Sequence, residues 1–242
     1  MQSIKGKIAI VTGASTGIGR GIATELAREG MVTVLAARSV DKLQSLEAEI
    51  AGFGGKAIVV PTDVTKEADV EALFRTTVER AGTPDLLVNN AGIADATPTD
   101  ELTLDHWHHV INTNLTSAYL CSREAIRLMK PAGGGRIVNI GSLSAKSPRP
   151  HSMAYTASKF AIEGMTRSIS FDGREDNITC CCLHPGATRS SLVPGITDQK
   201  TDNQIEPADL GRLVVYMASL PPEIAVLDTL ILPVKVPFLG RG

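Results

Sequence analysis

Tyr155 and Lys159 are the two residues whose types and spacing most directly suggest a reaction. They lie four positions apart in a stretch with a helical pattern, so both side chains would project from one face of a helix. A lysine ammonium beside a tyrosine favours the phenolate form of the phenol. Such a tyrosine could pass a proton to or from a carbonyl oxygen, which is general acid–base chemistry. Taken alone, the pair is also common on solvated helix surfaces, so it needs support from other residues.

Ser142 provides that support because it follows an apolar run, residues 136–141, that is typical of a buried strand. In open α/β sheets ligands bind at the carboxyl ends of the strands, where Ser142 would lie. Its hydroxyl could hydrogen-bond a substrate oxygen beside Tyr155. The sequence around Ser142 does not match the Gly-x-Ser-x-Gly turn of serine hydrolases, so we exclude a hydrolase triad.

A glycine-rich turn near the N-terminus predicts a phosphate-binding site. It reads Thr12-Gly13-Ala14-Ser15-Thr16-Gly17-Ile18-Gly19 and joins an apolar run to an amphipathic stretch. Glycines let the backbone approach a pyrophosphate, which binds at the positive N-terminus of the following helix. The turn therefore predicts a dinucleotide. An oxidised nicotinamide would add a second positive charge that favours the Tyr155 phenolate.

The end of the second apolar run bears on which dinucleotide binds. An acidic residue there would hold the ribose hydroxyls of NAD, whereas an arginine suits the additional phosphate of NADP. The chain has Ala36-Ala37-Arg38 at this point, with no carboxylate. The guanidinium of Arg38 can bind a phosphate through two parallel hydrogen bonds. We therefore expect NADP(H) as the favoured cofactor, with NAD(H) as the alternative.

Short apolar runs alternate with longer amphipathic stretches along the whole chain. Such a pattern predicts a parallel sheet of about seven strands, covered by helices on both faces and doubly wound. The expected strands cover residues 7–12, 32–36, 57–61, 85–89, 136–141, 178–183 and 229–232. The expected helices cover residues 17–29, 41–51, 66–80, 102–129, 152–171 and 207–219. Asp41 would cap the second helix, and Pro131 with residues 133–135 would stop the fourth.

The 242 residues are expected to form one dinucleotide-binding and catalytic domain. An irregular stretch, about residues 186–206, is long enough to be a substrate-binding loop.

Composition narrows the classes of function. The net charge is −2 and the isoelectric point is about 6.2, so nothing indicates nucleic-acid or anionic-membrane binding. The N-terminus does not resemble a secretory signal, and no apolar run is long enough for a membrane span. Cys180, Cys181 and Cys182 would point to alternate faces of a strand, a poor arrangement for disulfides. We therefore expect a cytoplasmic protein with reduced thiols.

The histidines are not predicted to bind a metal. His106, His108 and His109 lack the three acidic or thiol partners nearby that a metal site would need, so an exposed helix face is the simpler interpretation. His151 could line a substrate pocket, and His184 is expected to be a buried, hydrogen-bonded side chain.

Together these motifs resemble the short-chain dehydrogenase/reductase family. The resemblance rests on Thr12-Gly13-x-x-x-Gly17-Ile18-Gly19, Asn89-Asn90-Ala91-Gly92, Ser142, Tyr155-x-x-x-Lys159 and Pro185-Gly186, and it spans residues 5 to about 235. It implies a Rossmann-like fold and reversible hydride transfer between a nicotinamide cofactor and an alcohol or ketone. It also implies a homotetramer or homodimer formed through the helices at 102–129 and 152–171.

The resemblance also implies residue roles. Asn114 would kink the long helix and hold a water in a proton relay to Lys159, which would also bind the nicotinamide ribose. The expected catalytic residues are Asn114, Ser142, Tyr155 and Lys159. The expected cofactor-binding residues are Gly13, Ser15, Thr16, Gly17, Ile18, Gly19, Arg38, Ser39, Asp63, Val64, Asn90, Ala91, Gly92, Tyr155, Lys159, Pro185, Gly186, Thr188 and Ser190.

Three positions depart from the family pattern. Thr16 stands where NADP-preferring members often carry a basic residue, which leaves Arg38 as the main phosphate ligand. Ser190 stands where threonine is common, and residues 226–234 replace the usual glycine-rich C-terminal motif. The sequence predicts an enzyme acting on a small ketone or secondary alcohol with NADP(H). The alternatives are an NAD-dependent alcohol dehydrogenase of the same family and a non-catalytic nucleotide sensor, which would be expected to lack Tyr155 or Lys159.

Overall fold

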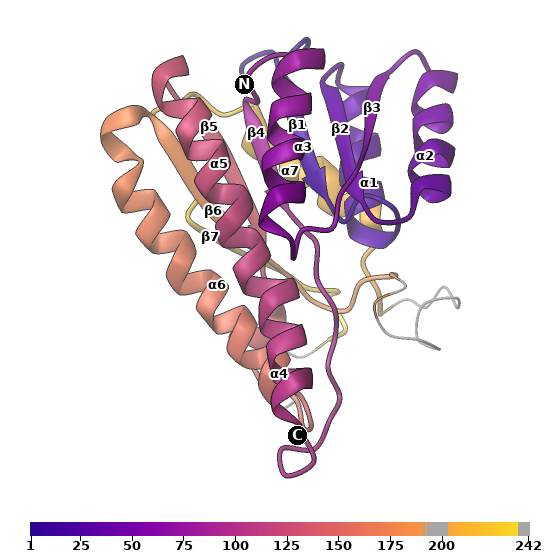
Figure 1. The fold of residues 1–242 in the computed structure, drawn as a ribbon, viewed down its shortest axis with the longest axis vertical. Coiled ribbons are helices and arrows are strands. Elements are labelled where there is room, and N and C mark those ends of the chain that lie inside the picture. Colours follow the sequence, from indigo (N-terminus) through magenta and orange to yellow (C-terminus); the bar gives the residue numbers. More distant parts are fainter. Residues whose placement is uncertain (191, 193–202, 237–242) are drawn as a thin grey trace.

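A computed structural model of the chain describes residues 1–190, 192 and 203–236. They form a seven-stranded parallel sheet in the order β3-β2-β1-β4-β5-β6-β7, with helices on both faces (Figure 1). This is the predicted doubly wound, Rossmann-like arrangement. The strand order reverses beside β1, where two crossovers leave the sheet in opposite directions and open a crevice at the carboxyl ends of the strands.

The observed elements lie within one to three residues of most predicted boundaries. The strands are β1 (Ile8–Thr12), β2 (Val32–Ala37), β3 (Lys56–Pro61), β4 (Leu86–Asn89), β5 (Gly135–Ile140), β6 (Ile178–Pro185) and β7 (Asp228–Ile231). The α-helices are α1 (Gly17–Arg28), α2 (Val40–Gly52), α3 (Glu67–Arg80), α4 (Leu104–Ile111), α5 (Ser117–Ala132), α6 (Met153–Asp172) and α7 (Pro207–Ala218).

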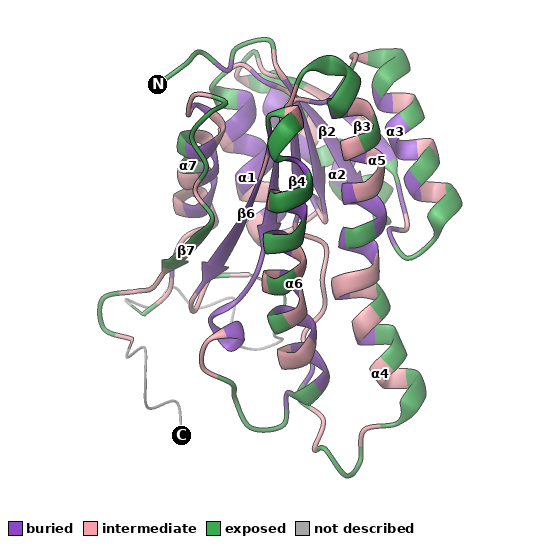
Figure 2. Cartoon of the chain, turned by 90° about the vertical axis from the view of Figure 1, so that its left-hand side faces the viewer, coloured by how far each residue is buried: buried purple, intermediate pink, exposed green. Residues whose placement is uncertain are grey.

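The central strands are apolar throughout because both of their faces are covered. Every residue of β1 and β4 is buried, and Figure 2 shows the buried residues concentrated in the sheet and on the inner sides of the helices. One buried cluster packs the sheet against α1, α2 and α7, and a second packs it against α3, α5 and α6. The two layers hold the strands rigidly, so the residues that follow each strand keep fixed positions.

The long helix predicted at 102–129 is not a single α-helix. It consists of α4, a π-helical turn at Asn112–Thr116 (η1) and α5. A π-turn adds one residue to the backbone ring and shifts the direction of the side chains that follow it. Periodicity could not reveal this, because one extra residue barely changes the pattern of apolar positions.

The predicted stop is confirmed at its glycines and wrong at Pro131, which α5 includes in its last turn. The helix ends at Gly133, the first residue of the predicted 133–135 stop, whose φ of 88° is the left-handed conformation that glycine adopts easily. The predicted cap at Asp41 is also wrong. Ser39 occupies the N-cap of α2, and Asp41 lies in the first turn, where its charge suits the helix dipole.

The predicted substrate loop, about 186–206, is described only in part. Its two ends are joined, because the Arg189 amide donates to the Ile205 carbonyl and the Ile205 amide donates to the Ala187 carbonyl. Residue 191 and residues 193–202 of this loop lie outside the described part of the chain. Among the described residues, no helix has the length and apolar character needed to cross a bilayer.

Candidate active site

A cavity of about 740 Å³ opens at the carboxyl ends of the central strands. It contains almost every residue predicted to bind the cofactor or to react. Gly19 and Asn114 are the two predicted residues that do not line it. The predicted residues on its wall are Gly13, Ser15, Thr16, Gly17, Ile18, Arg38, Ser39, Asp63, Val64, Asn90, Ala91, Gly92, Ser142, Tyr155, Lys159, Pro185, Gly186, Thr188 and Ser190.

The glycine-rich turn between β1 and α1 packs directly on the segment that follows β4. Gly13 has a φ of +66°, and a Cβ there would lie 2.8 Å from Asn90 Nδ2 and 2.9 Å from Ala91 Cα. A Cβ on Gly19 would collide with the Gly13 carbonyl. The Asn90 side chain donates hydrogen bonds to the carbonyls of Thr12 (3.0 Å) and Gly13 (3.2 Å). Backbone contact therefore requires glycine at both positions.

The N-terminus of α1 faces the cavity and fits a phosphate group. The first amides of a helix have no acceptor within the helix, and the Thr16 side chain does not cap them here. Gly17 has a φ of +53° and lies on the cavity wall with Ser15, Thr16 and Ile18. Because these residues line an open cavity in the described part of the chain, the turn forms a cradle that suits a pyrophosphate.

Arg38 and Asp63 lie at the end of the cavity formed by β2 and β3. Arg38 is exposed and forms no ion pair with a carboxylate in the described part of the chain. The hydroxyl and amide of Thr65 both donate to Asp63 Oδ1, at 2.7 and 3.1 Å. The hydroxyl's hydrogen bond is the main reason that the pKa of Asp63 is lowered, so this residue is a carboxylate at neutral pH. Arg38 is therefore available for an anion, and Asp63 for a hydrogen-bond donor.

Tyr155, Lys159 and Ser142 meet at the other end of the cavity. Tyr155 lies in the first turn of α6, and Lys159 follows one turn later, with its Nζ 5.6 Å from the centre of the Tyr155 ring. Lys159 Nζ donates to the Ile140 carbonyl at 2.8 Å. All three side chains are nearly buried, at 5, 5 and 9% exposed respectively. The sheet and α6 thus bring a phenol, an ammonium and a hydroxyl to one wall.

Ser142 begins the short 3₁₀ turn Leu143–Ala145 (η2) directly after β5. Its Oγ accepts the Ser144 amide at 3.0 Å, which fixes the side chain as the N-cap of that turn. The hydroxyl hydrogen remains free to point into the cavity.

Asn114 lies in η1, behind the cavity wall. Its Oδ1 accepts the Ile93 amide at 2.8 Å, and its Nδ2 donates to the Ile93 carbonyl at 3.0 Å and to Ser158 Oγ at 3.1 Å. A Cβ on Gly92 would lie 3.3 Å from Asn114 Oδ1. Asn114 therefore ties the segment after β4 to α6, next to Lys159.

Sequence reasoning missed two residues of the substrate end, His109 and Thr113, which line the cavity from α4 and η1. No motif marks these positions, because the packing of α4 beside α6 brings them to the cavity. Arg149, from the segment between η2 and α6, and Gln204, inside the predicted substrate loop, also line the cavity, whereas His151 is not among the lining residues.

The geometry agrees with comparisons to known proteins. Residues 7–201 match the family model for short chain dehydrogenases. The chain is 40% identical over 188 residues to a 3beta-hydroxysteroid dehydrogenase of Mediterraneibacter gnavus, covering 77% of this chain and 68% of that protein.

Solved structures agree with the fold as well. A short-chain type dehydrogenase/reductase from Mycobacterium marinum superimposes with a TM-score of 0.88 at 30% identity, over 95% of both chains. An alcohol dehydrogenase from Thermococcus sibiricus, solved with 5-hydroxy-NADP, superimposes with a TM-score of 0.88 at 27% identity, over 96% of this chain and 98% of that one. The chain therefore belongs to the short-chain dehydrogenase/reductase family of oxidoreductases.

Proposed function

We propose that this protein transfers a hydride reversibly between NADP(H) and a small ketone or secondary alcohol. The observation that carries the proposal is the presence of Ser142, Tyr155 and Lys159 on the wall of the same cavity as the glycine-rich turn. A nucleotide sensor would have no need of a buried phenol and ammonium beside its ligand. Burying such groups costs free energy, so their placement favours catalysis over binding alone.

The proton chemistry is assigned to the three side chains at the β5 end of the cavity. Tyr155 donates its phenolic proton to the substrate oxygen during reduction and takes it back during oxidation. Ser142 donates a hydrogen bond to the same oxygen and so fixes its direction. Lys159 stabilises the phenolate through its charge. Asn114 keeps the Ile93 segment and α6 at a constant separation. The bound cofactor supplies or accepts the hydride.

NADP(H) is favoured over NAD(H) because of Arg38. This guanidinium lies on the cavity wall without a carboxylate partner in the described residues, and β2 ends without an acidic residue. The Thermococcus sibiricus relative, whose structure contains 5-hydroxy-NADP, is consistent with this choice. Thr16 adds a hydroxyl but no charge, so Arg38 carries the preference.

The substrate end of the cavity favours a carbonyl compound with an acceptor or anionic group. His109 and Arg149 line it, and neither forms an ion pair with a carboxylate in the described part of the chain. Acetoacetate and its neutral ethyl ester form a matched pair that tests this preference. We expect a lower KM for acetoacetate, by about tenfold, from one additional ion pair in a partly enclosed site.

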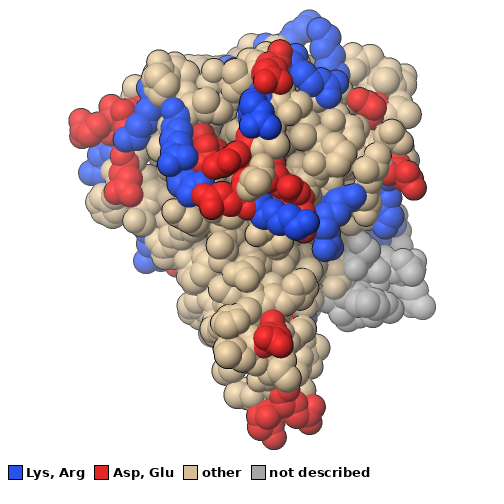
Figure 3. Space-filling view, in the orientation of Figure 1, with Lys and Arg blue, Asp and Glu red and all other residues tan. Residues whose placement is uncertain are grey.

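We also propose a homo-oligomer, either a tetramer or a dimer, that functions in the cytoplasm. Figure 3 shows few charged side chains over the lower half of the face that contains α4, α5 and α6. Tyr119, Phe160 and Phe171 are exposed on α5 and α6. Exposed aromatic side chains on adjoining helices are typical of subunit contacts. The four cysteines are buried free thiols, as expected in a reducing compartment.

The test is a fluorescence titration with NADPH and NADH, followed by turnover assays on acetoacetate, ethyl acetoacetate and cyclohexanone. We expect tighter binding of NADPH by about tenfold or more, equivalent to about 1.4 kcal/mol. Tighter binding of NADH would favour the alternative function, an NAD-dependent alcohol dehydrogenase. Binding of a cofactor without turnover of any ketone or alcohol would favour the nucleotide sensor.

A further inference from the structure

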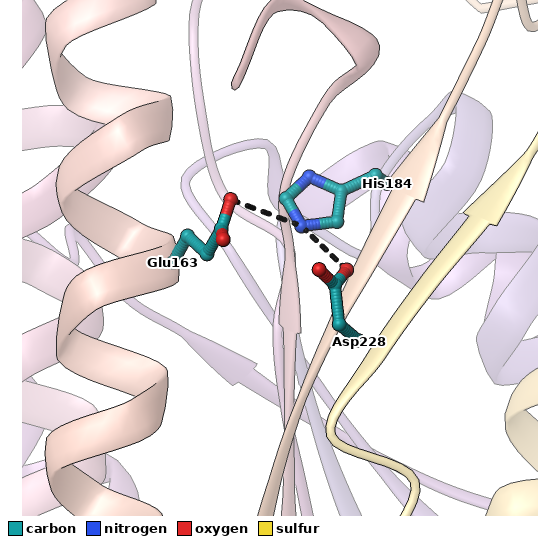
Figure 4. Close-up of side chains that lie close together, drawn as sticks. All are labelled: Glu163, His184 and Asp228. Atoms are coloured by element: carbon teal, nitrogen blue, oxygen red, sulfur yellow. Dashed lines mark ion pairs between the residues drawn. The ribbon is translucent and has the colours of Figure 1, made fainter. Parts of the chain in front are cut away.

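A cluster of four charged or titratable side chains lies directly behind the Ser142 turn. It is built by Lys146 after η2, Glu163 on α6, His184 near the end of β6 and Asp228 at the start of β7. Figure 4 shows His184 between the two carboxylates. His184 Nε2 lies 3.1 Å from Asp228 Oδ1 and 3.9 Å from Glu163 Oε2. The family match and the proposed reaction leave this cluster without a role.

The His184 ring packs against the backbone that leads into Ser142. A Cβ on Gly141 would lie 2.5 Å from His184 Nδ1, so the ring leaves room only for glycine at this position. The Ser142 amide donates to His184 Nδ1 at 3.3 Å when this nitrogen carries a lone pair. The Ser142 carbonyl, which accepts the Ala145 amide at 3.0 Å, also lies 3.0 Å from Nδ1. The position of the ring proton therefore decides which of these two contacts forms.

His184 has only one ring proton to place. The side chain is fully buried, and this burial lowers its pKa, so the imidazole is neutral at physiological pH. A neutral imidazole donates from one nitrogen and accepts at the other. Nε2 forms no hydrogen bond within the described residues, but the two carboxylates lie close to it. Their negative charge favours a proton on Nε2 over a lone pair, which leaves the Nδ1 lone pair for the Ser142 amide.

Lys146 pairs with both carboxylates. Its Nζ lies 2.6 Å from Asp228 Oδ2 and 2.8 Å from Glu163 Oε2. Burial acts to lower the pKa of Lys146, but the hydrogen bonds with these two carboxylates outweigh it and raise the pKa. Three residues of this cluster, one histidine and two carboxylates, are of the types that bind metal ions. The ammonium already occupies the position between the carboxylates, so the cluster has its own cation.

We propose that His184 is a positioning residue for the reaction. Asp228 and Glu163, which both pair with Lys146, hold it in the Nε2–H form, and its Nδ1 accepts the Ser142 amide. This contact fixes the backbone from which the Ser142 hydroxyl reaches the substrate oxygen. The inference rests on the proposed function, and it links the C-terminal strand β7 to the active site through Asp228.

The first test is the protonation of His184, measured by ¹⁵N NMR of the full chain with labelled histidine. The two ring nitrogens of a neutral imidazole differ strongly in shift, so the spectrum identifies which one carries the proton. We expect Nε2–H in the wild-type protein and a gain of Nδ1–H in Asp228→Asn. The control is Asp176→Asn, which removes a surface ion pair with Lys130. An Nδ1–H wild type, or a spectrum unchanged by Asp228→Asn, overturns the proposal.

The second test separates an acceptor at Nδ1 from mere packing. An asparagine side-chain oxygen can occupy the place of Nδ1, whereas leucine offers no acceptor. With the best ketone of the panel above, we expect His184→Leu to lower kcat by about 10- to 100-fold, because misplacing a reacting group costs rates of this order. We expect His184→Asn to recover most of the loss, with the Kd for NADPH unchanged in both. Equal kcat values for the two variants overturn the positioning role.

Two further outcomes are informative. The expected NMR result without turnover of any ketone or alcohol would count against the proposed function and leave the proton placement intact. Stoichiometric binding of Zn²⁺ by the wild-type protein, with a higher Tm, would overturn the role of Lys146 as the cation of the cluster. If His184→Leu does not fold, the Asp228→Asn spectrum still decides the proposal.

Discussion

Two turns of the same fold, one after β1 and one after β5, form two parts of the cavity wall in different ways. The first turn presents backbone amides at the N-terminus of α1, and its glycines keep side chains out of the way. The second presents the side chain of Ser142, which is backed by the buried ring of His184. Both follow a strand at the carboxyl edge of one sheet, where parallel strands place their ligand-binding turns.

Substitutions should therefore abolish the function of the two turns for opposite reasons. Backbone amides are present whichever amino acid stands at a position. Anion binding at such a turn is therefore lost when a new side chain blocks the approach to the amides, as at a substituted glycine. A proton-transfer site is lost when a particular side chain is removed, because no backbone group can replace a phenol or hydroxyl. Substitutions at each end therefore test which description applies.

The largest effect is expected at the catalytic end, from Tyr155→Phe. The change removes one oxygen from a buried ring and leaves the packing of α6 unchanged, so the fold should persist. We expect kcat to fall by about 1,000-fold, within the range for loss of a general acid–base group. Steady-state assays with the best ketone measure kcat, and fluorescence titration should give an unchanged Kd for NADPH. Turnover near the wild-type rate would refute the role of Tyr155.

At the glycine-rich end, Gly13→Ala is expected to weaken NADPH binding by about 30- to 100-fold. The new Cβ would approach Asn90 and the Ala91 backbone, and a φ of +66° is strained for alanine, which together cost about 2 to 3 kcal/mol. Titration of NADPH and a thermal melt measure the two consequences.

Gly164→Ala is the matched control for that substitution. Gly164 lies exposed within α6, and a Cβ there would meet no atom within 4 Å. Alanine should stabilise this helix by about 0.5 to 1 kcal/mol and leave NADPH binding unchanged. Equal effects at the two glycines would contradict a backbone-built site.

A smaller effect is expected from Arg38→Leu. Loss of the guanidinium should reduce the preference for NADPH over NADH by about tenfold, since one charge-assisted contact with phosphate contributes about 1.4 kcal/mol. Arg75→Leu removes an exposed arginine from α3, away from the cavity, and should change neither Kd. If Arg38→Leu still prefers NADPH over NADH as strongly as the wild type, other residues recognise the phosphate.

The smallest effect concerns the pH dependence of stability. Burial lowers the pKa of His184 in the folded protein, so below the ordinary value of about 6.5 the unfolded chain binds a proton that the folded protein does not. The free energy of unfolding should therefore fall as the pH is lowered from about 7.5 to about 5.5, by at most about 1.4 kcal/mol per pH unit for this group. Urea titrations at several pH values measure it. The decline should be shallower in His184→Asn, and an identical decline would assign the pH dependence to other groups.

Much of this structure can be predicted from the sequence, because short residue patterns reflect local conformational preferences. Alternating apolar runs and amphipathic stretches revealed the strands and helices, and the glycine-rich turn and the Tyr155 and Lys159 spacing placed the cavity residues. The predictions failed where the local pattern was ambiguous. The last turn of α5 tolerates Pro131, and periodicity gave no sign of η1, where one additional residue leaves the apolar pattern almost unchanged. Only the family resemblance implied a kink at Asn114, which lies in η1.

The sequence by itself determined the fold class, the order of the elements and the parts of the cavity wall that short motifs mark, because each depends on residues close together in the chain. The family resemblance added wall residues such as Asp63, Asn90 and Thr188, which no local pattern singles out. Only the tertiary structure decided which distant side chains meet. Lys146 and Asp228 are 82 positions apart, and they pair because β7 aligns beside β6, with Leu230 opposite His184. His109 reaches the cavity for a similar reason, through the packing of α4 near α6. Strand pairing and helix packing are chosen by the whole core, so no local pattern encodes these contacts.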